Sequence, residues 1–190
     1  MTKPLLHAPK IAAFADLWYE TRAASSHSIP TKEDMPLRAL APFMPNLALI
    51  DLDEDGRSKY LLWGTEIATV IGVDLTGAYL DERMDAEAIA QLEAGVVQFE
   101  KEHGPDARRA HWSLGRGRTA SGREILYEDI SLPYIVPETG RIRFMAYVAV
   151  LETQGYGETQ VTRFSSEEAM WFDALAPRPD WMRLRQTETA

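Results

Sequence analysis

The stretch SKYLLWGTEIATVIGVDLTGAYLDERM, residues 58–84, decides the fold. It begins with aromatic residues around leucines, a combination that favours a strand. Gly64 then provides a flexible hinge, and Thr65 provides a side-chain oxygen that can cap a helix. Apolar residues recur at helical spacing over 66–71, and Gly72 stands where a left-handed residue ends a helix. This succession of strand, hinge and short helices predicts one wall of a small cavity.

Length and composition are those of an ordinary globular protein. The chain has 190 residues, a net charge of -9 and 45% hydrophobic residues, which predicts one domain plus extensions. Proteins that bind the phosphate groups of nucleic acids or anionic membranes need a basic surface, and this chain is acidic. We therefore expect neither nucleic acid nor an anionic membrane as a partner. The absence of cysteine excludes disulfides, thiolate metal sites and cysteine nucleophiles. No apolar run approaches the roughly 20 residues that span a bilayer, and no signal-peptide core is present, so we expect a cytoplasmic protein.

An amphipathic pattern over residues 10–24 precedes the central stretch. Ile11, Phe14, Leu17 and Trp18 fall on one side of the predicted helix. This stripe needs a surface to pack on, which is either the sheet of its own domain or a second copy of the chain. The two alternatives are compatible, and we predict a homodimer through the helix around Ile11 to Trp18.

The order of the remaining signals indicates an α+β domain. An Asp-Gly turn at residues 53–56 joins the first pair of strands, and an amphipathic helix over 85–104 separates them from the later ones. The predicted strands cover residues 46–52, 60–63, 107–114, 124–132 and 141–151. We therefore predict a five-stranded antiparallel sheet with helices across one face.

The chain after residue 152 has a different pattern. A glycine-containing linker leads to Ser165 and Glu168, which have the spacing of a capping box before an apolar run. We predict a short helix that ends near Ala174. A terminal segment around Trp181 follows, and it either packs on the domain or frays, with a partner-binding peptide as the minor alternative.

These residues resemble the bacterial PAS family, specifically members in which an N-terminal helix bearing a tryptophan leads into the sensor fold. The resemblance rests on Trp18 with Arg22, on the Gly-Thr pair at 64–65, and on Gly-Val-Asp-Leu-Thr-Gly at 72–77. It covers roughly residues 12–151 and implies the order of two strands, several helices and three strands. We predict an arm and helix over 1–28, a PAS-like sensor domain over 29–152, and a linker, short helix and tail over 153–190, the last of which lies outside the resemblance. The family's members bind different ligands, so the scaffold does not name one.

Two motifs imitate known binding loops. Asp51, Asp53 and Asp55 precede Gly56 in the manner of a calcium loop, but the later ligand positions hold Ser58 and Leu62. We interpret this segment as a hairpin turn.

Gly117 and Gly122 have the spacing of a phosphate loop, but the required lysine is absent and the segment joins two strands. The arginines around this loop form a basic patch. We interpret it as a solvated loop, with contact to an acidic partner or a phosphate-bearing ligand as the minor alternative.

The sequence names no cofactor. A haem needs an axial ligand such as histidine, and His103 lies at the very end of the long predicted helix, which is a poor location. Without cysteine, neither a flavin–cysteinyl adduct nor a thioester-linked chromophore can form, whereas a non-covalent flavin is unsupported by any residue pattern. We therefore leave the cofactor unknown and expect no metal.

The candidate pocket lining is aromatic with a few polar groups, as is usual for small-molecule sites. The predicted lining residues are Tyr60, Trp63, Thr65, His111 and Tyr147. No catalytic arrangement stands out, so the leading hypothesis is a non-catalytic PAS sensor that binds a small molecule or partner and signals to an unidentified output protein. The alternatives are a small α+β-cone enzyme or ligand carrier, for which His111 with a nearby carboxylate would be the acid–base pair, and a structural adaptor with a filled cavity.

Overall fold

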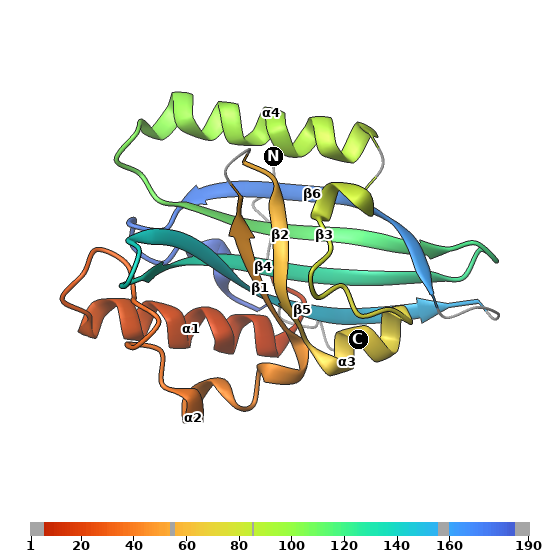
Figure 1. The fold of residues 1–190 in the computed structure, drawn as a ribbon, viewed down its shortest axis with the longest axis horizontal. Coiled ribbons are helices and arrows are strands. Elements are labelled where there is room, and N and C mark those ends of the chain that lie inside the picture. The colour runs from red at the N-terminus through yellow and green to blue at the C-terminus, as the bar shows by residue number, and fades with distance from the viewer. Residues whose placement is uncertain (1–5, 54–55, 85, 156–159, 185–190) are drawn as a thin grey trace, which may run out of the picture.

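A six-stranded antiparallel sheet in the order β2-β1-β5-β4-β3-β6 carries the fold (Figure 1). This computed structural model describes residues 6–53, 56–84, 86–155 and 160–184. The strands are β1 (Leu47–Leu52), β2 (Ser58–Trp63), β3 (Arg109–Thr119), β4 (Glu124–Val136), β5 (Arg141–Gln154) and β6 (Val161–Asp173). The helices are α1 (Pro9–Ala24), α2 (Leu37–Leu40), α3 (Thr65–Ile71) and α4 (Ala86–His103), with single 3-10 turns η1 (Met44–Asn46), η2 (Leu80–Glu82) and η3 (Asp180–Met182).

The α+β class and the order of two strands, several helices and a final group of strands are confirmed, and β3, β4 and β5 correspond to the three strands predicted in that group. Gly72 ends α3 with a φ of 73°, as its place in the sequence predicts. Thr65 is the first residue of α3 and makes no capping hydrogen bond, since the N-cap position belongs to Gly64. A side chain at Gly64 would lie 2.3 Å from the carbonyl oxygen of Pro45, so this glycine allows α3 to pack close against the segment before β1.

The predicted C-terminal helix is wrong, and so is the count of five strands. Residues 161–173 form β6, which pairs with β3 along its whole length, for example Ala110 with Phe172 and Arg118 with Arg163. Ser165 and Glu168 have capping-box spacing, but this local signal competes with the unpaired N–H and C=O groups along the edge of β3. The ladder satisfies those groups, and Phe172 becomes buried against the sheet core.

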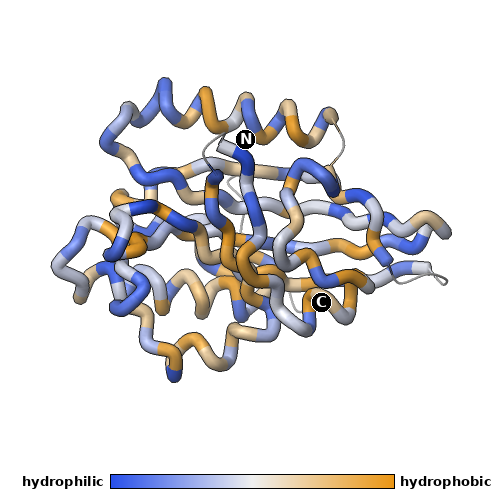
Figure 2. The backbone as a smooth tube through the Cα atoms, viewed as in Figure 1, coloured by the Kyte–Doolittle hydropathy of each residue, from blue (hydrophilic) through white to orange (hydrophobic). Residues whose placement is uncertain are grey.

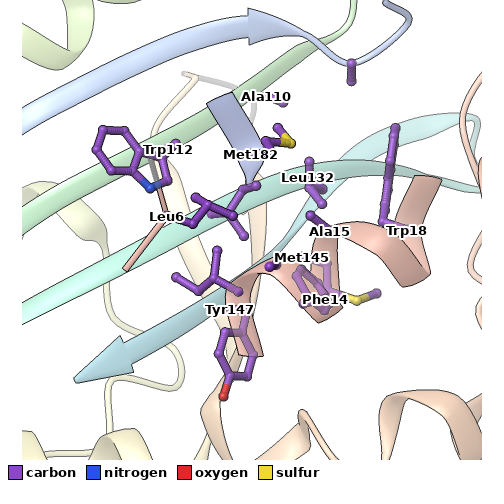
Figure 3. Close-up of a cluster of buried hydrophobic side chains, with 14 of the residues drawn as sticks. Leu6, Phe14, Ala15, Trp18, Ala110, Trp112, Leu132, Met145, Tyr147 and Met182 are labelled. Carbon is purple, nitrogen blue, oxygen red and sulfur yellow. The ribbon is translucent and has the colours of Figure 1, made fainter. Parts of the chain in front are cut away.

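Helices cover both faces of the sheet, and α1 and α4 lie on opposite sides of it (Figure 1). On one face, Phe14 of α1 packs against Tyr147 of β5, and Trp18 and Met145 belong to the same larger core cluster (Figure 3). Trp18 is fully buried, and its indole N–H donates to the carbonyl oxygen of Pro133 at 2.9 Å. The predicted apolar stripe of this helix therefore packs on the sheet of its own domain.

The opposite face of the sheet packs against α3 in a second cluster. Ile67 and Ile71 of α3 meet Ala48 of β1, Ala146 of β5 and Val161 of β6. Ala146 thus belongs to this second cluster and its neighbours Met145 and Tyr147 to the first, because successive side chains of a strand point to opposite faces. Hydrophobic and hydrophilic residues accordingly mix along both the helices and the strands (Figure 2).

The α4 helix packs over β6 through a close approach at Gly95. A side chain at this position would lie 2.3 Å from the indole nitrogen of Trp171, so glycine lets the helix approach the strand.

Among the described residues, no helix is long and apolar enough to cross a membrane.

The N-terminal arm and the C-terminal segment meet on the α1 side of the sheet. Glu128 of β4 is fully buried and accepts the backbone N–H groups of His7 at 3.0 Å and Ala8 at 2.7 Å, and the indole N–H of Trp112 at 3.0 Å. Leu6 then pairs with Leu184 in an isolated bridge. The carboxylate therefore holds the start of α1 against the middle of the sheet.

Replacing Glu128 with glutamine tests this anchor. The amide removes the charge and presents an N–H₂ group to three donors, so we expect the free energy of unfolding to fall by about 3 kcal/mol. Urea denaturation measures the change, and the exposed Glu138→Gln in the β4–β5 turn is the matched control. Equal denaturation midpoints for the two variants would contradict the anchoring role.

Homodimerisation through α1 stays a prediction. Ile11, Phe14 and Trp18 are fully buried within the protomer, so the side of the helix that remains for a second copy carries Lys10, Ala13 and other exposed residues. Sedimentation of the full chain tests the dimer: we expect a mass of two chains, and a monomer at high concentration would contradict it.

Candidate functional site

A cavity of about 120 Å³ lies between the sheet and α3. Its walls are mainly apolar and include Ile50, Ile67, Ile71, Ile125 and Val148. One side of the cavity is polar, and its groups come from β3 and β4: His111, Ser113, Tyr127, Asp129 and Ser131. An apolar chamber with a few grouped polar side chains is the usual composition of a small-molecule site.

Strand alternation and register gather the polar side chains. His111 and Ser113 are two residues apart on β3 and therefore point to the same face. In the ladder with β4, His111 lies opposite Ser131 and Ser113 lies opposite Asp129. Side chains at directly opposite positions are within contact distance, so the polar groups form one patch and not separate sites.

Asp129 is the central group of this patch. Its carboxylate accepts a hydrogen bond from the hydroxyl of Ser113, while its other oxygen lies 3.9 Å from Nδ1 of His111. Burial raises the pKa of Asp129 to about 7, the Ser113 hydrogen bond opposes this rise, and the charge of Glu128 adds to it. The carboxyl group therefore changes protonation near neutral pH.

His111 is held in its neutral form. Burial lowers the pKa of its imidazole to about 4, and the ring packs against Trp171 with centroids 4.6 Å apart. The Asp129 carboxyl group hydrogen-bonds Ser113, and its distance from the imidazole exceeds hydrogen-bonding range. The arrangement thus differs from a Ser-His-Asp triad, in which histidine stands between the other two groups.

Aromatic rings form a second part of the lining. Tyr60 and Trp63 of β2 meet edge to face with centroids 4.7 Å apart, and Tyr127 and Phe164 do the same at 5.8 Å. Trp63 is only 8% exposed, and its indole N–H is buried with no hydrogen-bond partner among the described residues. Burial also raises the pKa values of the Tyr60 and Tyr127 hydroxyl groups, which keeps both neutral.

A groove of about 540 Å³ adjoins the cavity beneath α4. Leu92 of α4, Met84, His111 and Ser131 line both spaces, so the polar patch borders on the groove. The groove continues along Ile89, Val96 and Val97 of α4 towards the β1–β2 hairpin. It offers a route between the cavity and the outside of the protein.

The structure brings together Tyr60, Trp63 and His111 from the predicted lining. Thr65 instead lies exposed at the start of α3, where its carbonyl oxygen accepts the hydroxyl of Thr69. Tyr147 points to the other face of the sheet and packs against Phe14. The placement of these two residues in the pocket was therefore wrong, whereas ligand binding by the other three stays a prediction.

Sequence reasoning missed Asp129, Ser113 and Ser131. Their signal is present in the sequence as polar residues at every second position, Tyr127-x-Asp129-x-Ser131 and His111-x-Ser113. Recognising them as one patch also requires the register between β3 and β4, which the sequence does not display.

The described aspartates of the calcium-like segment have partners within the protein. Asp51 lies 3.0 Å from both Arg141 and Arg143, and the side chain of Asp53 accepts the backbone N–H of Arg57 within the turn. Asp55 lies outside the described residues. No group of three or more potential metal ligands is found among the residues that the structure describes.

Two arginines near the phosphate-loop imitation lie on a strand, whereas Arg123 lies in the turn between β3 and β4. Arg116 and Arg118 belong to β3, and both pair with Glu124. Arg116 also pairs with Glu167 on β6 at 2.5 Å. Carboxylates of the protein itself therefore pair with these two arginines of the basic patch. His103 ends α4 and packs against Phe99, away from the cavity lining.

Comparison with known proteins finds similarity at the level of solved structures. No family model matches the chain, and no curated protein matches it. A PAS-B domain of Drosophila melanogaster Cycle with bound glycerol has 17% sequence identity and a TM-score of 0.40, covering 55% of this chain and 98% of that one. A PAS domain from Colwellia psychrerythraea has 13% identity and a TM-score of 0.40, covering 60% and 96%. A light-oxygen-voltage domain studied with a flavin analogue has 10% identity and a TM-score of 0.42, covering 61% and 84%.

Replacing Asp129 with asparagine tests the protonation of the buried carboxyl group. Between about pH 4 and pH 7 the folded state holds a proton that the unfolded state has released, so this group makes the wild type less stable as pH rises. Asparagine removes that contribution. We therefore expect the stability of the variant minus that of the wild type to increase across this range by up to about 4 kcal/mol.

Denaturation at a series of pH values measures this difference. The altered hydrogen bond to Ser113 adds an offset that does not depend on pH. Asp106→Asn, at an exposed position, is the matched control and should show a small, nearly constant difference. A difference for Asp129→Asn that is equally flat would contradict the raised pKa.

Proposed function

We propose that this chain is a non-catalytic PAS-type sensor or interaction module. It binds a small molecule in the cavity between the sheet and α3 and passes the bound state on through protein–protein contacts. The proposal is supported by the element order that the PAS resemblance implies and by the cavity on the α3 face. The carrying observation is the grouping of Asp129 and Ser113 with other polar side chains of β3 and β4, and the unpartnered Trp63 N–H, in a lining that is mainly apolar.

A purely structural core is an unfavourable place for such groups. A buried polar group without full hydrogen bonding costs free energy that an apolar residue of similar size avoids. The same groups provide orientation and selectivity when a ligand enters. The cavity thus has the composition of a recognition site, and the adaptor with a filled cavity is the less favoured alternative.

Signal output requires two states with different contacts. A ligand in this cavity would contact β3 and β4 at the polar patch and α4 through Leu92. Residue 128, next to Asp129 on β4, holds the start of α1 on the other face. A shift of the polar patch would therefore reach α4 on one face of the sheet and α1 on the other. We propose that the output protein binds one of these two helices.

Filling the cavity tests ligand binding. Ala146→Leu places a larger side chain among the lining residues, and Ala41→Leu makes the same change at an exposed position after α2. We expect mass spectrometry of the freshly purified wild type and of the Ala41 variant to detect a co-purifying small molecule. Its amount should fall at least tenfold in the Ala146 variant, because the new side chain occupies its space.

Equal retention by both variants would place the molecule outside the cavity. If the wild type retains no molecule and no compound in a small-molecule screen raises its melting temperature, the adaptor is favoured over the sensor.

A small enzyme of the α+β-cone type is the second candidate function. The observation that favours it is the buried pair of His111 and Asp129, whose atoms lie 3.9 Å apart within the cavity. Such a pair acts as acid and base when the pKa values match the reaction. The pKa of Asp129 near neutrality suits this role, whereas the low pKa of His111 and its distance from the carboxyl group do not.

Incubation of the purified protein with its co-purifying molecule distinguishes the two functions. A sensor releases that molecule with its mass and structure unchanged after many hours at neutral pH. Turnover that disappears in Asp129→Asn and persists in Asp106→Asn would contradict the non-catalytic proposal.

A further inference from the structure

The Asp129 side chain is largely enclosed, at 15% exposure, and the described residues place no cationic side chain in the cavity with it. Neither lysine nor arginine is among the residues that line the cavity, and His111 is neutral. The only hydrogen bond to the Asp129 side chain in the described structure comes from Ser113. An ionised carboxylate in such a place is costly, since buried charges are stable only when they are paired.

The surrounding aromatic rings provide a second, independent feature. The pairs Tyr60 with Trp63 and Tyr127 with Phe164 line the same cavity as Asp129. The faces of aromatic rings attract cations, and several rings arranged round one space are the recurrent means of holding organic ammonium groups. The same lining offers no cation for the carboxylate or phosphate group of an anionic ligand.

We propose that the cavity binds a small organic ammonium ion, with its charged nitrogen at Asp129 and its carbon skeleton among the aromatic and aliphatic side chains. This inference rests on the proposed function, because it names the ligand class of the same site. The ammonium group provides the charge partner that the protein lacks, and the N–H of Trp63 remains available for an acceptor atom on the ligand.

Binding of an ammonium ion changes the proton count of the complex. In the free protein below neutral pH, the Asp129 carboxyl group holds a proton. When the cation arrives, the carboxyl group gives that proton to solvent and becomes the carboxylate that pairs with the ligand. The titratable groups that face it, His111, Tyr60 and Tyr127, stay neutral throughout. The proposal therefore predicts release of a proton that a neutral ligand of the same shape does not cause.

Three probes of similar shape test the charge preference: benzylamine, benzyl alcohol and benzoate. The readout is the NMR shift of the isoleucine methyl groups at the cavity, such as Ile67, Ile71 and Ile125, in the full chain. We expect benzylamine to bind at least tenfold more tightly than benzyl alcohol, and benzoate to bind least. Calorimetry in two buffers of different ionisation enthalpy should show proton release for the amine alone.

Asp129→Asn and the exposed Asp106→Asn provide the matched variants, since each removes one carboxyl group. We expect the preference for the amine over the alcohol to disappear in the first and to persist in the second. Equal or tighter binding of benzyl alcohol by the wild type would overturn the inference, as would an amine preference that survives Asp129→Asn.

The outcomes separate this inference from the proposed function. If benzyl alcohol or benzoate shifts the cavity methyl groups without an advantage for the amine, the ammonium assignment fails and the binding cavity stands. If none of the three probes shifts them and the purified protein retains no molecule, both proposals fail together.

Discussion

Glu128 and Asp129 are neighbours on β4, and the strand turns their carboxyl groups to opposite faces of the sheet. Helices cover both faces, so Glu128 is fully buried, the Asp129 side chain is only 15% exposed, and each carboxylate needs a partner. Glu128 finds its partners within the chain, namely the backbone of the N-terminal arm and the indole of Trp112. Asp129 accepts a hydrogen bond from a hydroxyl group, and no lysine or arginine of the described residues lines its cavity. One carboxylate thus holds the fold together, while the other gives the cavity its chemistry.

Much of the fold could be predicted because its signals are local. Gly72 marks the end of α3, and the stripe of Phe14 and Trp18 correctly predicts a helix that packs on the sheet. The β6 strand could not be predicted in the same way, because Ser165 and Glu168 carry a local helix signal. Its strand conformation depends on an edge of β3 that lies far away in the sequence. Non-local pairing outweighs local propensity at this position.

The candidate site was less predictable, for a related reason. Tyr60 and Trp63 could be selected as aromatic residues of the central stretch, and His111 as a polar residue of a predicted strand. Tyr147 was misplaced because its face depends on the phase of β5, and the neighbouring Ala146 is the residue that lines the cavity. Asp129 was missed because an acidic residue in a strand of an acidic protein suggests an exposed face. Only the position of α3 and α4 over that face buries it.

The ionisation of Asp129 underlies both the proposed binding site and the ligand class assigned to it. The most direct measurement follows the carboxyl carbon of Asp129 by NMR as the pH of the ligand-free protein is raised through the acid and neutral range. The account predicts a midpoint at about pH 7, far above the ordinary aspartate value of 3.8. A midpoint near the ordinary value of 3.8 would show a solvated or internally paired carboxylate and would contradict the account.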